Sequence, residues 1–331
     1  MKRNLGSWFL VLELLSAWTV GRAGAQVTTE QPASILVFPK VIVDDASDTV
    51  IQISTASPLT ARVWCFYVDA VSAGAGTSPG LLVTDFALWL SKQQPVSWVV
   101  SAGRPAVGPG PVPSITGPFR GELLCVETGA EGTPLGGHHL TGIVTLKHRQ
   151  NEDIAKYSAI GFLGTDFAGE TGLSLPLGGS GSDRQYDGCP AEWRLDHLAD
   201  GAEDPQIGPG SSVRTHLTIV PCSHDLITFV PARVTVVFEV TNEFEEVFFA
   251  SMPVEGWFDG PLSSVSDVFS ASRLGTLAAQ TRMRPALGDP GFLVVGQEFH
   301  QSGGPAVLEA SAAVNAHGQG TRDEPDFILL P

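Results

Sequence analysis

Short apolar or alternating runs, separated by Gly, Pro, Asp and Ser, recur along most of the chain. Val234–Val240 alternates strictly, with Val and Phe on one side and Thr235 and Glu239 on the other. Ala61–Val68 is instead apolar on both faces, which predicts a central strand covered on both sides. Runs of this length between turn-forming residues are typical of β-strands. The pattern therefore predicts an all-β protein.

The first half of the chain has about seven such runs, a density typical of a β-sandwich. The predicted strands are Ser34–Val43, Thr49–Ser54, Ala61–Val68, Phe86–Leu90, Val96–Val100, Glu122–Glu127 and Thr141–Lys147. Pro39 marks an edge position or a kink in the first strand, because proline has no N–H for a neighbouring strand. Ile154–Leu163 is predicted as one further strand.

A second β region begins near Ser211, where alternating apolar residues lead to Cys222. Its other predicted strands are Val234–Val240, Phe244–Met252, Phe292–Phe299 and Val307–Ala316. Thr241-Asn242-Glu243 is predicted as the turn of a hairpin.

Two long loops rich in Gly and Pro or Gly and Ser are expected at residues 101–118 and 165–188. Pro190–Ala199 is predicted as a helix, because proline suits a first helical turn and Trp193 can share a face with His197. Leu262–Phe269 is a second, shorter helical candidate.

Several segments are similar in pattern to a known class of β-sandwich. They are Phe38-Pro39, Thr49–Ile53, Ala61–Val68, Gly121–Val126 and Leu140–Val144. Together they resemble the opening and closing strands of immunoglobulin-like sandwiches in secreted bacterial proteins of mostly uncharacterised role. The resemblance covers about a third of the chain and implies a fold, but it brings no catalytic residue with it.

The length of 331 residues favours two domains. We therefore expect two immunoglobulin-like β-sandwich domains with long Gly/Pro-rich loops and one or two short helices. The expected divisions are a signal peptide (1–25), a polar lead-in (26–33), a first sandwich (34–164), a loop-rich connector with a short helix (165–210) and a second sandwich (211–331).

The first 25 residues have the features of a cleavable secretory signal. Lys2 and Arg3 precede the apolar stretch Leu5–Val20, and Ala23-Gly24-Ala25 predicts cleavage between Ala25 and Gln26. Glu13 departs from the pattern, but the stretch is shorter than the roughly 20 residues of a membrane span. The residue directly after the cleavage site is not a cysteine, so a lipid anchor is not indicated, and no second apolar stretch long enough to span a membrane occurs. We therefore expect a secreted or periplasmic protein without membrane insertion.

The cysteines are Cys65, Cys125, Cys189 and Cys222. An even number in an exported chain predicts disulfides. Three pairings are open, and Cys65–Cys125 with Cys189–Cys222 is favoured because each pair falls within one expected domain. Four free thiols are the alternative, whereas the spacing lacks the close cysteine pairs of a zinc site.

The chain carries a formal net charge of −16. This charge argues against nucleic acid and anionic membranes as partners, because both require basic patches. No nucleophile elbow, penicillin-recognition motif, zinc-protease motif, P-loop or dinucleotide fingerprint is present in the sequence. Enzymatic activity is therefore not indicated, and no catalytic residue is assigned.

Two groups of residues could hold a metal ion. Asp196, Asp200, Glu203 and Asp204 lie close together in sequence, with Asp183 and Asp187 upstream, and loop carboxylates of this kind suit calcium. His138, His139 and His148 could bind a transition metal. His138 and His139 would point to opposite faces of a strand, however, so they would not bind one ion together. The acidic cluster is explained as solvated surface, which is usual in an acidic protein. No cofactor is therefore expected, with calcium as the alternative.

Surface tryptophans would indicate a glycan-binding platform, and Trp89, Trp98 and Trp257 are the candidates, although sandwich tryptophans mostly fill the core. The favoured interpretation is a non-enzymatic, exported interaction or structural module with a protein or glycan partner. One alternative is a hydrolase or metal-dependent enzyme with a site in the 165–205 loops, where His197, Asp196 and Asp200 would converge. The other is a subunit of a cell-surface assembly, with Ile35–Val43 or Phe327–Leu330 as an exposed edge strand.

Overall fold

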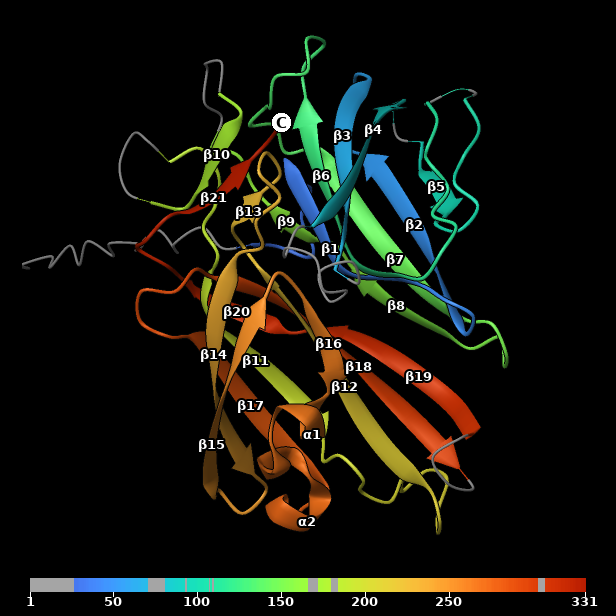
Figure 1. The fold of residues 1–331 in the computed structure, drawn as a ribbon, viewed down its shortest axis with the longest axis vertical. Helices are drawn as coiled ribbons and strands as arrows, with labels where there is room; N and C mark the ends of the chain where they lie inside the picture. The colour runs from blue at the N-terminus through green and yellow to red at the C-terminus, as the bar shows by residue number, and fades with distance from the viewer. Residues whose placement is uncertain are drawn as a thin grey trace, which may run out of the picture.

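The computed structural model describes residues 27–70, 81–92, 94–106, 108, 110–165, 172–179, 184–302 and 307–331. The predicted signal peptide, its cleavage site at Ala25–Gln26 and Asp183 lie outside these residues. The regular secondary structure of the described chain is almost entirely β, with strands in five sheets (Figure 1). Within the described residues, no helix is long and apolar enough to cross a bilayer. The expected all-β fold is confirmed.

Nine strands of the first half form two antiparallel sheets. Their bounds are β1 (Ile35–Val43), β2 (Ser47–Thr55), β3 (Ala61–Asp69), β4 (Leu82–Leu90), β5 (Val96–Val99), β6 (Phe119–Thr128), β7 (Leu140–His148), β8 (Ile154–Ser158) and β9 (Ile160–Phe162). One sheet has the order β4-β3-β6-β1-β9 and the other β5-β2-β7-β8. The predicted single strand Ile154–Leu163 is therefore two strands in different sheets.

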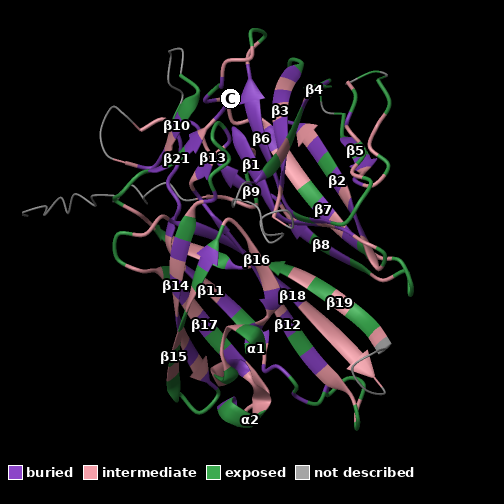
Figure 2. Cartoon of the chain, viewed as in Figure 1, coloured by how far each residue is buried: buried purple, intermediate pink, exposed green. Residues whose placement is uncertain are grey.

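Aromatic side chains join the two sheets of the first half. The indole N–H of Trp98 on β5 donates to the hydroxyl of Tyr67 on β3 at 2.6 Å. Phe86 on β4 packs edge-on against Trp98, with 5.9 Å between ring centroids. As predicted, β3 is an inner strand, and buried residues are dense along β1, β3 and β6 (Figure 2). Burial of these large rings stabilises the packing of one sheet on the other.

Pro39 kinks β1, which was one of its two predicted roles. The register between β1 and β6 shifts between Phe38 and Val41. The Tyr157 hydroxyl occupies the irregularity: it accepts from the N–H of Lys40 at 2.9 Å and donates to the Lys40 carbonyl at 2.7 Å. The buried backbone is thus satisfied without a ladder bond at the proline. As a whole β1 is an inner strand between β6 and β9, but β9 pairs only with Ile35–Val37, so Pro39 lies beyond that pairing.

The second half also contains a five-stranded and a four-stranded antiparallel sheet, with orders β15-β14-β17-β11-β20 and β16-β12-β18-β19. The bounds are β11 (Pro190–Leu198), β12 (Ser212–Pro221), β14 (Arg233–Asn242), β15 (Val247–Glu255), β16 (Phe258–Pro261), β17 (Ala278–Pro285), β18 (Phe292–Ser302), β19 (Val307–Asn315) and β20 (His317–Thr321).

The helix expected at Pro190–Ala199 is wrong, because this segment is strand β11. Trp193, Leu195 and His197 alternate as buried residues, which is the two-residue period of a strand. Pro190 occupies the first strand position, where a proline is tolerated. The prediction at Leu262–Phe269 is confirmed as two short turns, α1 (Leu262–Val265) and η3 (Asp267–Phe269), followed by α2 (Ala271–Leu274).

A small fifth sheet brings the C-terminal end of the chain beside the first half (Figure 1). It has the order β10-β21-β13, with β10 (Ser174–Leu177), β21 (Asp326–Leu329) and β13 (His224–Asp225). The pair β13–β21 is parallel. The expected edge strand at Phe327–Leu330 is therefore also wrong, since β21 has a neighbour on each side.

Both favoured disulfides are present. Cys65 on β3 lies directly opposite Cys125 on β6, within one sheet. The second bridge joins Cys189, just before β11, to Cys222, just after β12. Disulfides of this kind fit an oxidising compartment.

Buried polar pairs join the two halves. The ammonium of Lys40 on β1 lies 2.6 Å from a carboxylate oxygen of Asp259 on β16, and both side chains are almost fully buried. His224 Nε2 lies 2.7 Å from the Glu122 carboxylate on β6, also buried. The indole N–H of Trp257 donates to the Pro39 carbonyl at 2.8 Å. Such contacts favour one arrangement of the halves, because a shift that kept these charges buried would leave them without partners.

Candidate functional site

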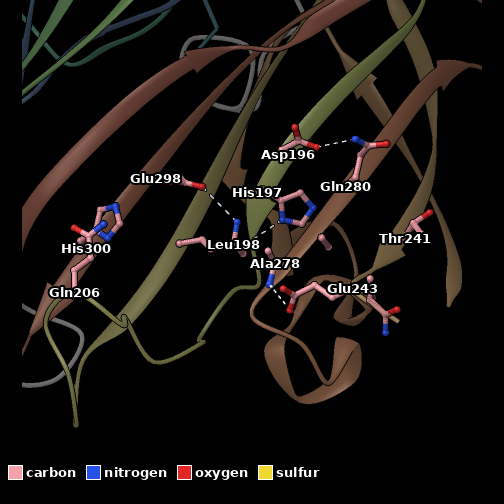
Figure 3. A pocket seen from close by; sticks show the side chains of 12 residues that line it. Asp196, His197, Leu198, Gln206, Thr241, Glu243, Ala278, Gln280, Glu298 and His300 are labelled. Carbon is pink, nitrogen blue, oxygen red and sulfur yellow. Dashed lines mark hydrogen bonds between the residues drawn. The ribbon is translucent and has the colours of Figure 1, made fainter. Parts of the chain in front are cut away.

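A cleft of about 700 Å³ opens where β11 ends (Figure 3). We call it the acidic cleft. Its lining comes from β11, β14, β17, β18 and the loop that follows β11. The lining residues are Asp196, His197, Leu198, Gln206, Thr241, Asn242, Glu243, Ala278, Ala279, Gln280, Glu298 and His300.

An unpaired stretch of β11 lies at this cleft. On one side, β17 pairs with β11 over Trp193–Leu198. On the other, β20 pairs only with Pro190–Arg194, so the last residues of β11 have no strand on that edge. The Glu298 side chain on β18 accepts the N–H of Leu198 at 3.3 Å instead. A side chain from the facing sheet thus replaces a strand, which leaves this end of the sheet open.

The carboxylates of Asp196, Glu243 and Glu298 give the cleft its negative charge. Neighbouring residues of the same sheet position the first two. Asp196 accepts from the Gln280 amide at 2.8 Å. Glu243 accepts the N–H of Leu277 at 3.1 Å and that of Ala278 at 3.4 Å. No described lining residue is Lys or Arg. A concave surface lined by one sign of charge concentrates ligands of the other sign.

The two imidazoles of the cleft already have partners. His197 is buried, with Nε2 2.8 Å from the Thr281 hydroxyl and Nδ1 3.1 Å from the Leu198 carbonyl. Burial lowers the pKa of His197, and this favours the neutral ring. His300 Nδ1 lies 2.7 Å from the buried carboxylate of Asp204. Both rings are therefore committed to structural contacts.

Burial alone would raise the pKa of Asp204, but the N–H of Gln206 and the His300 ring outweigh it and lower the pKa. Asp204 is therefore held as an anion beside the His300 ring. Their contact ties the loop after β11 to β18.

The four predicted calcium ligands do not converge. Asp196 faces the cleft, and Asp204 contacts His300. Asp200 is buried and accepts the N–H of Thr215 at 2.7 Å and of Ser263 at 2.8 Å, while Glu203 is exposed. Within the described part of the chain, the one group with metal-ligand spacing is Cys189, Cys222 and Asp326, and its two sulfurs already form a disulfide.

The enzymatic alternative required His197, Asp196 and Asp200 to converge. Asp196 and His197 do line one cleft, but Asp200 is not among its lining residues, because its carboxylate joins two backbone segments. Upstream, the buried Asp187 pairs with Arg184 at 2.6 Å. The structure thus brings together two members of the predicted triad.

The remaining histidine candidates are also apart. His139 Nδ1 lies 2.7 Å from the buried Glu127 carboxylate. Burial raises the pKa of Glu127, although the His139 contact opposes it. His148 instead lies at the end of β7, beside the second half. The described part of the chain does not group these histidines as metal ligands.

Only one of the three candidate tryptophans is exposed. Trp89 is 47% exposed and lies under the Arg62 guanidinium. Trp98 fills the core of the first half, and the indole of Trp257 binds the Pro39 carbonyl between the halves. The structure therefore supplies no tryptophan platform from these three residues.

Sequence reasoning missed several residues of the cleft: Gln206, Glu243, Gln280, Glu298 and His300. They lie far apart along the chain, and strand pairing brings them together. The alternation within Phe292–Phe299 could have indicated that Glu298 faces inward, but no sequence pattern connects it to β11.

Comparisons with known proteins give no family. Neither a scan of protein-family models nor a search of curated proteins finds a match. One solved structure that matches is the N-terminal CBM22-1-CBM22-2 tandem domain from Paenibacillus barcinonensis Xyn10C. It is 10% identical, with 81% of this chain and 84% of that chain covered and a TM-score of 0.18. Similarity at this level carries no functional argument.

Proposed function

We propose that this protein is an exported, non-enzymatic binding module that receives a cationic group of a protein or glycan partner in the acidic cleft. The supporting observation is that three carboxylates line a cleft without a described Lys or Arg, while both imidazoles are engaged in structural contacts. A cationic group would gain charge-assisted hydrogen bonds from carboxylates that are already held in place.

The same proposal includes two immunoglobulin-like sandwich domains and a secreted or periplasmic location. Two pairs of five- and four-stranded sheets support the first part, and two disulfides support the second. One departure from antibody domains is that Cys65–Cys125 links neighbouring strands of one sheet, whereas the antibody bridge joins two sheets. Mass measurement of the exported protein should give a chain that begins at Gln26, and an intact N-terminus would contradict export by cleavage.

Calorimetric titration tests the acidic cleft. The probes are a trilysine peptide and a chitosan oligosaccharide, with the N-acetylated oligosaccharide as an uncharged comparison. We expect Asp196→Asn with Glu243→Gln to weaken binding of the cationic probes about tenfold or more, because two charge-assisted contacts are lost.

The control variant is Glu255→Gln, which removes a carboxylate on β15 outside the cleft. It should change affinity less than about twofold, as expected for a distant surface charge. Equal weakening in both variants, or no binding of either cationic probe, would contradict the proposal.

A surface-assembly subunit is a second candidate, on the evidence of β15. This strand is the outer member of its sheet and exposes Val247 and Phe249, at 48% and 67%. Long apolar edge strands are templates for pairing with another chain. Sedimentation velocity should show self-association that Phe249→Lys abolishes, and a monomer at all concentrations would exclude assembly through this edge.

A further inference from the structure

A second cleft, of about 490 Å³, lies between the two halves of the molecule. We call it the basic cleft. The turn after β7 forms one wall, and the outer face of the β12–β18 pair forms the other. Its lining residues are His148, Gln150, Asn151, Arg214, His216, Phe299, Gln301 and Leu308.

The charge of this lining is opposite to that of the whole protein. The chain carries a formal net charge of −16, yet none of the described residues lining this cleft is Asp or Glu. Arg214 is exposed, and its side chain makes no ion pair or hydrogen bond with the described residues. A guanidinium presents paired donors that match the geometry of a carboxylate, phosphate or sulfate.

Two further polar groups of the lining lack partners. Nδ1 of His148 and Oε1 of Gln301 are inaccessible to solvent and have no hydrogen bond with any described residue. A buried polar group without a partner costs about 1–3 kcal/mol, so rotation of either side chain that brings its polar atom to a ligand in the cleft is favoured. Rotation of the Gln301 amide exchanges its oxygen for a donor, so both side chains can serve an anion.

The cleft also has an apolar side. The rings of Phe299 and His216 pack at 4.7 Å between centroids, and Leu308 also lines the cleft. His216 Nδ1 lies 3.9 Å from the Asp259 carboxylate, at the inner end of the cleft. A smaller cavity of about 120 Å³ shares His148, His216, Phe299 and Leu308 and extends toward Lys40.

Contacts between the halves hold the two walls at a fixed separation. The Asn151 amide donates to the Leu308 carbonyl at 2.9 Å. Asn315 on β19 both accepts from the Ser158 N–H, at 3.0 Å, and donates to its carbonyl, at 2.8 Å. The site is therefore formed before a ligand arrives, which reduces the entropy cost of binding.

We propose that the basic cleft binds a small organic oxyanion, in which a carboxylate, phosphate or sulfate group is carried on an apolar or aromatic body. Arg214 holds the charged group, His148 and Gln301 supply further polar contacts, and Phe299 and Leu308 cover the apolar body. This site is separate from the acidic cleft and does not depend on what that cleft binds.

Calorimetric titration with five anions tests the proposal: benzoate, phenyl phosphate, phenyl sulfate, inorganic phosphate and inorganic sulfate. We expect the aromatic anions to bind more tightly than the inorganic ions, because only they reach Phe299. The order among benzoate, phenyl phosphate and phenyl sulfate identifies the preferred charged group.

Arg214→Gln should weaken binding of the aromatic anions by about 10- to 100-fold, the loss expected for one charged hydrogen-bonding contact. The control is Arg233→Gln, which removes an arginine that is 68% exposed and pairs with Glu255 outside the cleft. It should change affinity less than about twofold.

The imidazole signals of His148 and His216 should shift in NMR spectra during the benzoate titration, with His148→Gln and His216→Gln used for assignment. Absence of binding by all five anions at concentrations up to about 20 mM, or equal weakening in Arg214→Gln and Arg233→Gln, would overturn the proposal. Tighter binding of the inorganic ions than of the aromatic ones would overturn the role of Phe299.

Discussion

The acidic and basic clefts lie on opposite faces of the same strand, β18. Glu298 and His300 line the acidic cleft, whereas Phe299 and Gln301 line the basic one. Successive residues of a strand point to opposite faces of its sheet. The four consecutive residues 298–301 therefore line two sites of opposite charge. Their closeness in sequence alone would suggest a single site.

The two clefts differ in what lies beneath them. The acidic cleft is bounded by the open end of β11, where a side chain substitutes for a strand. The smaller cavity that shares residues with the basic cleft is lined by the Lys40–Asp259 pair, whose side chains are 1% and 4% exposed. Burial alone would raise the pKa of Asp259, but Lys40, His216 and Thr218 outweigh it and hold the pKa well below its usual range. We therefore expect substitution of a buried residue beneath the basic cleft to lower the free energy of unfolding more than substitution in the acidic cleft.

The largest effect is expected for Lys40→Met. It leaves the Asp259 carboxylate buried without its cation and should lower the free energy of unfolding by about 3–5 kcal/mol. Urea denaturation measures this loss. Arg214→Gln, at an exposed position of the basic cleft, is the comparison and should stay within about 0.5 kcal/mol of the native protein. Equal stability of Lys40→Met and the native protein would show that the pair does not hold the halves together.

A smaller effect is expected at the acidic cleft. Glu298→Ala removes the acceptor of the Leu198 N–H and should cost about 1 kcal/mol, whereas Glu298→Gln keeps an acceptor and should cost less than half of that. Hydrogen exchange of the Leu198 amide provides a local measurement, and it should accelerate in the alanine variant alone. Unchanged exchange in both variants would mean that this end of β11 is held in another way.

The smallest effects are pH dependences of opposite sign. Burial lowers the pKa of His197, so the unfolded chain takes up the proton more readily. The free energy of unfolding should then fall as pH decreases below about 6.5, the usual histidine pKa. Denaturation curves between pH 7 and pH 5 should show a smaller fall in His197→Gln than in the native protein, and equal falls would contradict this role.

Burial also acts to lower the pKa of His224, but the Glu122 carboxylate and the Cys222 carbonyl outweigh it and raise the pKa. The stabilising contribution of His224 to the free energy of unfolding is complete below about pH 6.5, the usual histidine pKa. It is lost as pH rises through the raised pKa of the folded protein. The native protein should therefore lose stability on this rise, while His224→Gln should not. A parallel loss in both proteins would assign the effect to another group.

The strands that could be predicted from the sequence are those in which apolar and polar residues alternate along the whole segment. In β14, Val234, Val236, Phe238 and Val240 are all buried, as their spacing indicates. At Pro190–Ala199, helical and strand periods both fit, and the pairing of β11 with β17 and β20 decides for the strand. Such pairing joins residues distant in sequence, so local periodicity does not contain it.

The candidate sites were less predictable than the strands. Asp196 and His197 were identified from their residue types, but Glu298 and Gln280 reach them only through sheet packing. His148 was considered as a metal ligand, and its actual neighbours, Arg214 and His216, belong to the other half. Which face of β18 lines the acidic cleft and which lines the basic one also depends on how β18 pairs with β12. The sequence does not show this pairing.

Because synthesis proceeds from the N-terminus, Lys40 is made 219 residues before its partner Asp259. Until Asp259 is made, the residue that pairs with Lys40 is missing, so the ammonium on β1 stays in contact with water. A fragment that ends before β16 would lack this partner and would leave the Lys40 ammonium on its surface. The buried pair can therefore form only after most of the chain has been synthesised.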